Sequence, residues 1–293
     1  MSLRRLSRII ALFFVFAYAM RLVAEDYSSW TRPFPPFRIA GNLYYVGSEE
    51  LASYLIATPR GNILINSSLE ANVPLIQKSV EQLGFRFADI KILLISQGHF
   101  DHCAGSALVK KLTGAQYFVM DADVPVVESG GRNDFNYSAD PDAWFPPMKV
   151  DRALHDGDTV ALGDAVLTAH LTAGHNKGTT TWTIDEVEGG KTLHVVIVGG
   201  PNVNPGYKLV GNTAYPRIAT DFHHGFQVLK SMPCDVFFGA HAGYFGLQEK
   251  YERWKRGDRN AFIDPAGYQS YIAGREQAFE TELKRQETAK QKR

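Results

Sequence analysis

The stretch Gln97-Gly-His-Phe-Asp-His102 constrains the fold of this chain more than any other feature. It follows a continuous apolar run over residues 90–95, which is typical of a strand buried on both faces. His99, Asp101 and His102 therefore fall at the end of a strand, where the chain turns into a helix and side chains can converge on one point. Imidazole nitrogens and carboxylate oxygens are ligands that zinc prefers. The stretch predicts a metal site at the edge of a sheet.

Two later histidines share this local setting. His175 lies in Thr172-Ala-Gly-His-Asn-Lys-Gly178, and His241 lies in Phe238-Gly-Ala-His-Ala-Gly-Tyr244. Each is on a glycine-flanked loop just after a predicted strand, so we expect all three stretches at one edge of the sheet architecture. Their common setting disfavours the alternative that the first stretch is a turn of hydrogen-bonded histidines. The other histidines lack this context and are expected in surface or packing roles: His155, His170, His194, His223 and His224.

Strands alternate with helices along the chain. Apolar runs bounded by glycine and proline predict strands at 43–46, 53–58, 62–66, 90–95, 115–119, 159–162, 166–171, 179–184, 193–198 and 236–239. Helical spacing of apolar residues predicts helices at 71–83, 104–112, 218–231 and 267–284. The first three strands, with tight turns between them, are expected to be antiparallel. Residues 129–147, rich in glycine, aspartate, proline and aromatics, are expected to form a long functional loop.

The N-terminus resembles a secretory signal peptide. Three arginines within the first eight residues precede an apolar run over residues 9–20 that is too short for a spanning helix. Cleavage after Ala19 or Ala24 would release a protein exported to a bacterial periplasm, without membrane contact. An uncleaved anchor is the alternative, because apolar residues continue past Arg21. We expect a single domain over 25–289 and a frayed tail at 290–293.

The composition argues against a nucleic-acid partner and against a disulfide scaffold. Lys and Arg total 31, as do Asp and Glu, so no net field favours nucleic acid. At 293 residues with 45% hydrophobic content, the chain can bury one large core. Cys103 and Cys234 are too few for a disulfide scaffold, and either one bridge or two thiols is compatible with their spacing. No extra apolar face is evident, so a monomer is expected.

The three histidine stretches together resemble the metal framework of the metallo-β-lactamase superfamily, and its subclass B3 in particular. The likeness runs from about Trp30 to about Lys284 and includes four further pieces, at 37–47, 51–56, 203–207 and 262–268. It implies an α/β (α+β) fold, the αββα sandwich, in which helices flank two mixed sheets and a shallow cleft at one edge holds zinc.

The resemblance also implies two zinc sites. The first would be held by Gln97, His99 and His175, and the second by Asp101, His102 and His241. The family usually has histidine where Gln97 stands, although one branch, the GOB type, has glutamine there. An amide oxygen is a weaker donor than imidazole, so we expect the first site to be weak or partly empty.

The implied activity is that of a β-lactamase conferring antibiotic resistance. A zinc-bound hydroxide, oriented by Asp101, would attack the β-lactam amide of penicillins, cephalosporins and carbapenems. Asn202 is the candidate donor for the substrate carboxylate. Trp144 and Phe145, with Phe135 and Tyr137, are expected to wall the cleft, unless these aromatics form the packing core of their own loop.

Two other functions remain compatible with the sequence. Lactonases and thioesterases of this superfamily usually carry a metal-bridging aspartate after the strand predicted at 193–198, and residues 193–220 contain none. Nuclease members carry extra domains for which this chain has no room. The other alternative is a catalytically silent zinc-binding scaffold in which Gln97 marks decay, but five of the six ligands persist.

Overall fold

The first half of the chain forms a seven-stranded mixed sheet. The computed structural model describes residues 27–292, so the expected signal peptide lies outside the described residues. The strands, in order along the chain and across the sheet, are β1 (Phe37–Ala40), β2 (Leu43–Tyr45), β3 (Tyr54–Thr58), β4 (Gly61–Ile65), β5 (Ile90–Leu94), β6 (Gln116–Met120) and β7 (Arg152–Leu154). Strands β1 to β4 are antiparallel, as expected for β2 to β4 from their tight turns, and β4 to β7 are parallel.

The second half forms a five-stranded mixed sheet. Its strands are β8 (Thr159–Leu162), β9 (Ala165–Leu171), β10 (Thr180–Glu188), β11 (Lys191–Val198) and β12 (Val236–Gly239). Their order across the sheet is β12-β11-β10-β9-β8. Strands β8 to β11 are antiparallel, and β12 adds to β11 in parallel.

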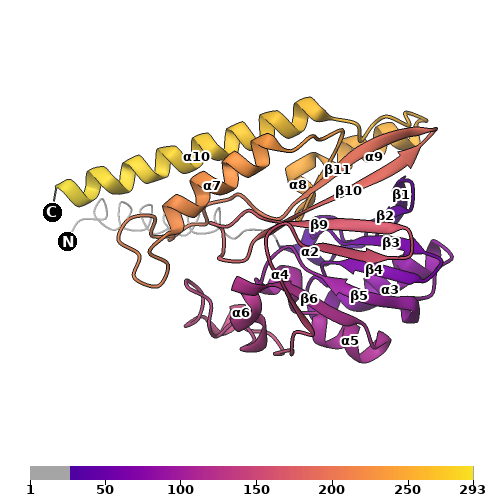
Figure 1. Ribbon diagram of the computed structural model, residues 1–293, viewed down its shortest axis with the longest axis horizontal. Coiled ribbons are helices and arrows are strands. Elements are labelled where there is room, and N and C mark those ends of the chain that lie inside the picture. Colours follow the sequence, from indigo (N-terminus) through magenta and orange to yellow (C-terminus); the bar gives the residue numbers. More distant parts are fainter. Residues whose placement is uncertain (1–26, 293) are drawn as a thin grey trace, which may run out of the picture.

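Helices cover the outer faces of both sheets. The α-helices of the described residues are α2 (Ser28–Thr31), α3 (Val73–Gln82), α4 (Phe100–Cys103), α5 (Ser106–Thr113), α6 (Val124–Glu128), α7 (Ile218–Ser231), α8 (Ala242–Phe245), α9 (Leu247–Lys255) and α10 (Pro265–Gln291). Figure 1 shows α3 and α5 outside the first sheet, and α7 and α10 on the opposite side of the molecule. The predicted αββα sandwich is therefore confirmed.

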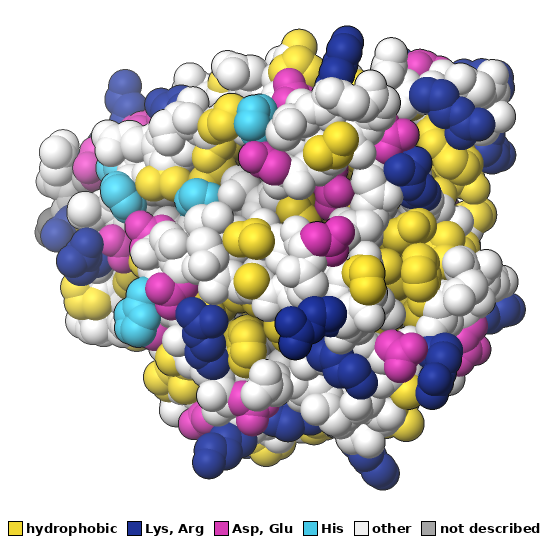
Figure 2. Space-filling model, turned by 45° about the vertical axis from the view of Figure 1, so that its right-hand side comes forward, with side chains coloured by type: hydrophobic (Ala, Val, Ile, Leu, Met, Phe, Trp, Pro, Cys, Tyr) yellow, Lys and Arg dark blue, Asp and Glu magenta, His cyan; other side chains and the backbone are white. Residues whose placement is uncertain are grey.

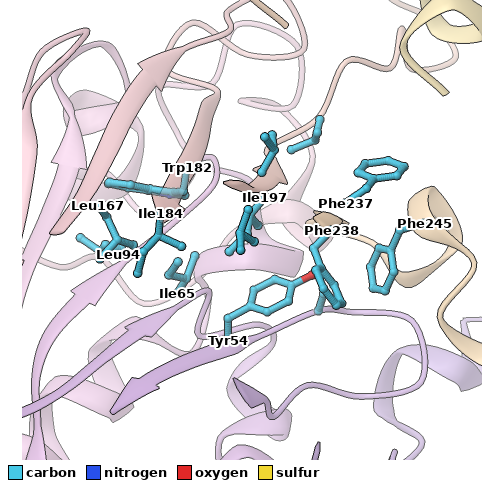
Figure 3. Close-up of a cluster of buried hydrophobic side chains, with 14 of the residues drawn as sticks. Tyr54, Ile65, Leu94, Leu167, Trp182, Ile184, Ile197, Phe237, Phe238 and Phe245 are labelled. Atoms are coloured by element: carbon cyan, nitrogen blue, oxygen red, sulfur yellow. The ribbon is translucent and has the colours of Figure 1, made fainter. Parts of the chain in front are cut away.

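The main core lies between the two sheets. In Figure 3, Tyr54, Ile65 and Leu94 of the first sheet face Leu167 and Trp182 of the second. Trp182 is 1% exposed, and its indole N–H donates to the Ile95 carbonyl at 3.1 Å. This bond ties the second sheet to the end of β5, next to the predicted metal site.

A second core lies under the helices of the first sheet. Val73, Ile76 and Val80 follow one another at helical spacing along α3 and pack with Leu64 and Leu93. Because the first sheet is covered on both faces, most of β5 is buried, as the apolar run predicts. Lys91 is the exposed residue of that strand.

Some elements differ from the prediction. The short strands β1 and β7 and the polar helix α9 have no clear periodic signature, and none was expected. Helix α10 continues through Gln291, where we expected a frayed tail. The side chain of Gln286 explains part of this extension, because it donates to the Tyr207 carbonyl and accepts from the Leu209 amide. These contacts cross 79 and 77 residues of sequence, so local patterns do not reveal them.

The surface of the described part mixes charges. On the face shown in Figure 2, Lys and Arg side chains are interspersed with Asp and Glu. Cys103, which is buried, and Cys234, which is half-buried, are both free thiols. No helix among residues 27–292 is long and apolar enough to cross a membrane.

Candidate metal centre

Three loops at one edge of the sandwich bring the predicted ligands together. Asp101 and His102 lie in α4, just after β5, and His241 immediately follows the Gly239-Ala pair at the end of β12. The ligand atoms of these three residues all lie within 4.8 Å of one another. The Asp101 carboxylate is 3.1 Å from His102 Nε2 and 3.3 Å from His241 Nε2. This geometry groups the three residues that the resemblance assigns to the second zinc.

The first predicted site lies beside this trio. The rings of His99 and His175 are 4.9 Å apart between centroids. His175 Nδ1 is 2.7 Å from the Asn202 carbonyl, which leaves Nε2 as its free ring nitrogen. The Gln97 amide nitrogen makes a long contact of 3.5 Å with the Gly199 carbonyl, and the buried Oε1 has no hydrogen-bond partner. Gln97 therefore has its oxygen available for a cation.

Two glycines leave the space that the predicted ligands of the first site occupy. A Cβ at Gly200 would lie 3.2 Å from Gln97 Nε2 and 3.4 Å from His175 Cδ2. The Gly174 φ of +135° is a conformation that other residues rarely adopt, and a Cβ there would meet the Phe222 ring at 2.5 Å. The glycine before His175 is thus required for the position of that ligand.

Burial and neighbouring charges set the protonation of the ligands. Burial, opposed by Asp101, lowers the pKa of His102, and burial next to His99 lowers the pKa of His175 to about 3. Burial alone would raise the pKa of Asp101, but His102 and His241 hold it well below its usual value. Burial alone would lower the pKa of His241, but hydrogen bonds and charge interactions with Asp101 and Glu50 outweigh the effect of burial and raise this pKa to about 9. At neutral pH the cluster thus offers neutral imidazoles at His102 and His175 and an ionised carboxylate at Asp101, whereas His241 is protonated until a cation displaces its proton.

The donor set fits zinc. Gln97 Oε1 and both ring nitrogens of His102 are buried without a hydrogen-bond partner. An unsatisfied buried polar group costs about 1–3 kcal/mol, which a bound cation would offset. Nitrogen donors combined with one carboxylate suit zinc better than calcium or magnesium, which prefer oxygen-rich sites.

Four of the six predicted ligands line a cleft of about 1060 Å³, and Gln97 and His102 are buried beside them. These four are His99, Asp101, His175 and His241, and Asn202 lines the same cleft. The Asn202 amide, which we expected to bind a substrate carboxylate, donates to the Tyr244 hydroxyl at 2.9 Å.

Trp144 and Phe145 lie away from the described lining of this cleft, contrary to expectation. Phe145 is 7% exposed and belongs to the core under the first sheet. Its amide donates to the Gly130 carbonyl, so the loop closes on itself. Trp144 stacks under the Arg132 guanidinium and donates its indole N–H to Ser138. The packing-core alternative describes Phe145, whereas Trp144 is 37% exposed and belongs to neither core, and Tyr137 does line the cleft.

The sequence reasoning missed one wall of the cleft. Trp30 of α2 lies 6.1 Å from both the His241 and the Phe100 rings, and Tyr27 stacks edge-on against it at 4.3 Å. The Asn72 side chain donates to the Trp30 carbonyl at 2.8 Å and holds this turn in place. No periodic pattern or motif at the N-terminal end of the domain indicates that contact.

Three carboxylates near the ligands were also missed. Asp123 accepts hydrogen bonds from the Gly98 amide, the Gly178 amide and the Asn176 side chain, and so joins the two loops of the first site. Burial raises the pKa of Asp123 to about 6. Glu50 lies 3.4 Å from His241 Nδ1, and Asp134 lies 3.4 Å from His99 Nε2. The remaining histidines are outside the cluster, as expected: His155, His170, His194, His223 and His224.

Comparison with solved structures gives strong similarity over most of the chain. The native FEZ-1 metallo-β-lactamase from Legionella gormanii is 58% identical, with 88% of this chain and 98% of that chain covered and a TM-score of 0.87. The class B3 di-zinc metallo-β-lactamase LRA-12 from an Alaskan soil metagenome is 34% identical, with coverages of 88% and 97% and a TM-score of 0.84.

Sequence comparisons agree with the structural ones. The model of the metallo-β-lactamase superfamily matches residues 51–188. A curated relative described as a UPF0173 metal-dependent hydrolase, from Anaeromyxobacter dehalogenans (strain 2CP-C), is 28% identical over 156 residues. That alignment covers 52% of this chain and about half of the relative, 51% of its length. Together with the fold and the clustered ligands, these similarities show that the chain belongs to the metallo-β-lactamase superfamily.

Proposed function

We propose that this protein is an exported zinc β-lactamase that opens the β-lactam amide bond of penicillins, cephalosporins and carbapenems. The observation that carries the proposal is the convergence of Asp101, His102 and His241 beside Gln97, His99 and His175 at one cleft, which four of the six residues line. The similarity to FEZ-1, whose description is that of a metallo-β-lactamase, supports hydrolysis of β-lactams. The similarity to a di-zinc enzyme supports zinc as the metal.

Zinc bound to these residues would lower the pKa of water from ~15.7 towards ~7 and so supply a nucleophile without a serine or cysteine. The residues of the chain would orient the reaction. Asp101, whose pKa is held well below its usual value, is an ionised acceptor at neutral pH and can hold the proton of the attacking water in a hydrogen bond. His102 and His175 have lowered pKa values, so they stay neutral and keep their lone pairs for the metal.

The side of the cleft near Asn202 is where we place the substrate carboxylate. Arg275 of α10 donates to Asn202 Oδ1 at 3.4 Å, and Asn202 Nδ2 donates to the Tyr244 hydroxyl. Arg275 thus brings a positive charge to the Asn202 side chain, and Glu50 and Asp134 also line the cleft. The aromatic wall around Trp30 would cover the apolar part of a bound antibiotic.

We further propose that the protein acts as a monomer in the periplasm and confers antibiotic resistance there. The arginines and the apolar run of the first 24 residues support export. The balanced charge of the chain supports a small-molecule substrate over a nucleic acid.

Hydrolysis of meropenem and benzylpenicillin by the purified mature protein tests the proposal, with zinc quantified in the same sample. We expect turnover that a chelator abolishes and added zinc restores, while circular dichroism shows that the fold persists. Bound zinc without turnover of either antibiotic would refute the lactamase function and direct substrate profiling to lactones and thioesters. Loss of folding on chelation, with no turnover beforehand, would indicate a structural zinc scaffold.

A further inference from the structure

We propose that Asp134 is the positioning residue of the first metal site: it orients His99 towards the metal and supplies the negative charge that Gln97 lacks. The inference rests on the proposed zinc centre and is independent of the substrate. Asp134 is on the loop between α6 and β7, 35 residues after His99, the predicted ligand that it contacts. No motif connects it to the ligands.

The carboxylate of Asp134 is fixed by the backbone of its own loop. Its Oδ1 accepts hydrogen bonds from the amides of Asn136 and Tyr137, each at 2.7 Å. Two such bonds hold the carboxylate in one orientation, with Oδ2 directed at the imidazole of His99. The Asp134 side chain is 3% exposed and that of His99 is 8% exposed, so water does not compete for this contact.

The two facing atoms have no other partner. His99 Nε2 and Asp134 Oδ2 are 3.4 Å apart, and both are buried without another hydrogen-bond partner. A buried carboxylate oxygen and a buried ring nitrogen are costly when left alone, so their pairing stabilises a proton on Nε2. His99 then keeps Nδ1 unprotonated, and no hydrogen bond among residues 27–292 occupies that atom. Nδ1 is therefore the nitrogen that His99 can offer to a metal together with His175 and Gln97.

The charge of Asp134 matters because the first group of donors is neutral. The second group contains the Asp101 carboxylate, whereas Gln97, His99 and His175 contain no anionic donor. A carboxylate on the far nitrogen of a ligating histidine fixes its tautomer and increases its basicity as a ligand. Glu50 has the same relation to His241, at 3.4 Å from its Nδ1. Each group of donors thus has one histidine backed by a carboxylate.

The variant Asp134→Asn tests the proposal with little change in shape. The asparagine oxygen can still accept from the Asn136 and Tyr137 amides, but its NH2 group would face His99 Nε2 and favour the tautomer with the proton on Nδ1. We expect the zinc affinity of the first site to fall about 10- to 100-fold, with the affinity of the second site unchanged. Zinc titration against a competing chelator, on the mature protein, measures both affinities.

Two further variants serve as controls. Asp142→Asn removes one charge from an exposed position of the same loop and should leave both zinc affinities unchanged. Glu50→Gln should weaken the second site and spare the first, the reverse of Asp134→Asn. Equal weakening of both sites by Asp134→Asn, or no weakening of the first, would overturn the proposal.

A measurement on the unsubstituted protein covers the case in which Asp134→Asn does not fold. Nitrogen-15 NMR of the metal-free protein at alkaline pH reports the tautomer of His99, and we expect the proton on Nε2. A proton on Nδ1 would overturn the proposal. This readout requires neither zinc binding nor turnover, so a failure of the proposed function is distinguishable from a failure of the role assigned to Asp134.

Discussion

At the scale of single residues, the two groups of predicted ligands differ in charge. Asp101 lies between His102 and His241, so the second group combines a carboxylate with two imidazoles. The first group contains Gln97, whose amide oxygen is neutral and a weaker donor than imidazole. The side chain of Gln97 is nevertheless 1% exposed, with Oε1 free of partners, which suits a ligand better than a residue left by decay.

Replacing Gln97 by histidine should increase zinc occupancy of the first site and leave the fold unchanged. Imidazole is the stronger donor, and we expect the affinity to rise roughly tenfold or more. Native mass spectrometry at limiting zinc measures the occupancy in both proteins. The same metal content in both would show that Gln97 does not limit binding.

At the scale of elements, the ligands depend on the turns that follow the strands. The turn between β9 and β10 places His175, and it uses Gly174 at φ +135° with the Phe222 ring of α7 directly against it. Asp123 then joins this turn to the loop after β5 through the amides of Gly178 and Gly98. The positions of these ligands are therefore set by the packing of whole turns against their neighbours.

Gly174→Ala should destabilise the protein and misplace His175. Backbone strain and the contact of 2.5 Å between the new Cβ and the Phe222 ring should together cost about 2–4 kcal/mol. Urea unfolding measures the loss of stability, and zinc titration measures the misplacement of His175. The loss of zinc affinity should be larger at the first site than at the second. Gly189→Ala, at φ +57° with open space around it, should cost only about 1 kcal/mol and leave zinc binding intact. Equal effects of the two substitutions would contradict this account of the turn.

At the scale of the whole molecule, two sheets of separate halves share one core and one metal edge. Glu186 of β10 belongs to the contact between them, because it accepts from the Asn42 amide in the turn between β1 and β2. Glu186 is 5% exposed, and its Oε1 has no hydrogen-bond partner. Burial raises the pKa of Glu186 to about 7 from the ordinary value of 4.5.

The raised pKa of Glu186 makes the free energy of unfolding depend on pH. Between pH 4.5 and about 7 the folded state binds a proton at Glu186 that the unfolded state has lost, so stability falls as the pH rises through this window. Glu186→Gln removes the charge, and we expect it to raise the free energy of unfolding by about 1–3 kcal/mol above the window and to change it little below. Urea unfolding of the metal-free proteins on both sides of the window measures the difference.

The neighbouring Glu188 offers a matched control. It is an exposed carboxylate paired with Arg38 at 2.7 Å, and hydrogen bonds from the Gly41 amide and from Arg38 lower its pKa. Glu188→Gln should therefore give no gain of stability at high pH. A gain of the same size in both variants would show that net charge, rather than the burial of Glu186, causes the effect.

The sequence by itself determined the fold class and the grouping of the ligand candidates. Buried strands, their turns and the spacing of His99, Asp101 and His102 depend on neighbouring residues, so local patterns contain them. The α7 helix and the strands β8 and β12 have the bounds that those patterns predict. The later histidines were found because each follows a strand and a glycine.

Only the tertiary structure decided what surrounds those ligands. Asp134, Glu50 and Trp30 reach the cleft because loops distant in sequence pack side by side, and no local pattern specifies such contacts. The same reason accounts for Phe145, whose loop closes on itself and buries the ring below the first sheet. Strand periodicity is a property of a few adjacent residues, whereas the orientation of a ligand depends on the packing of the whole molecule.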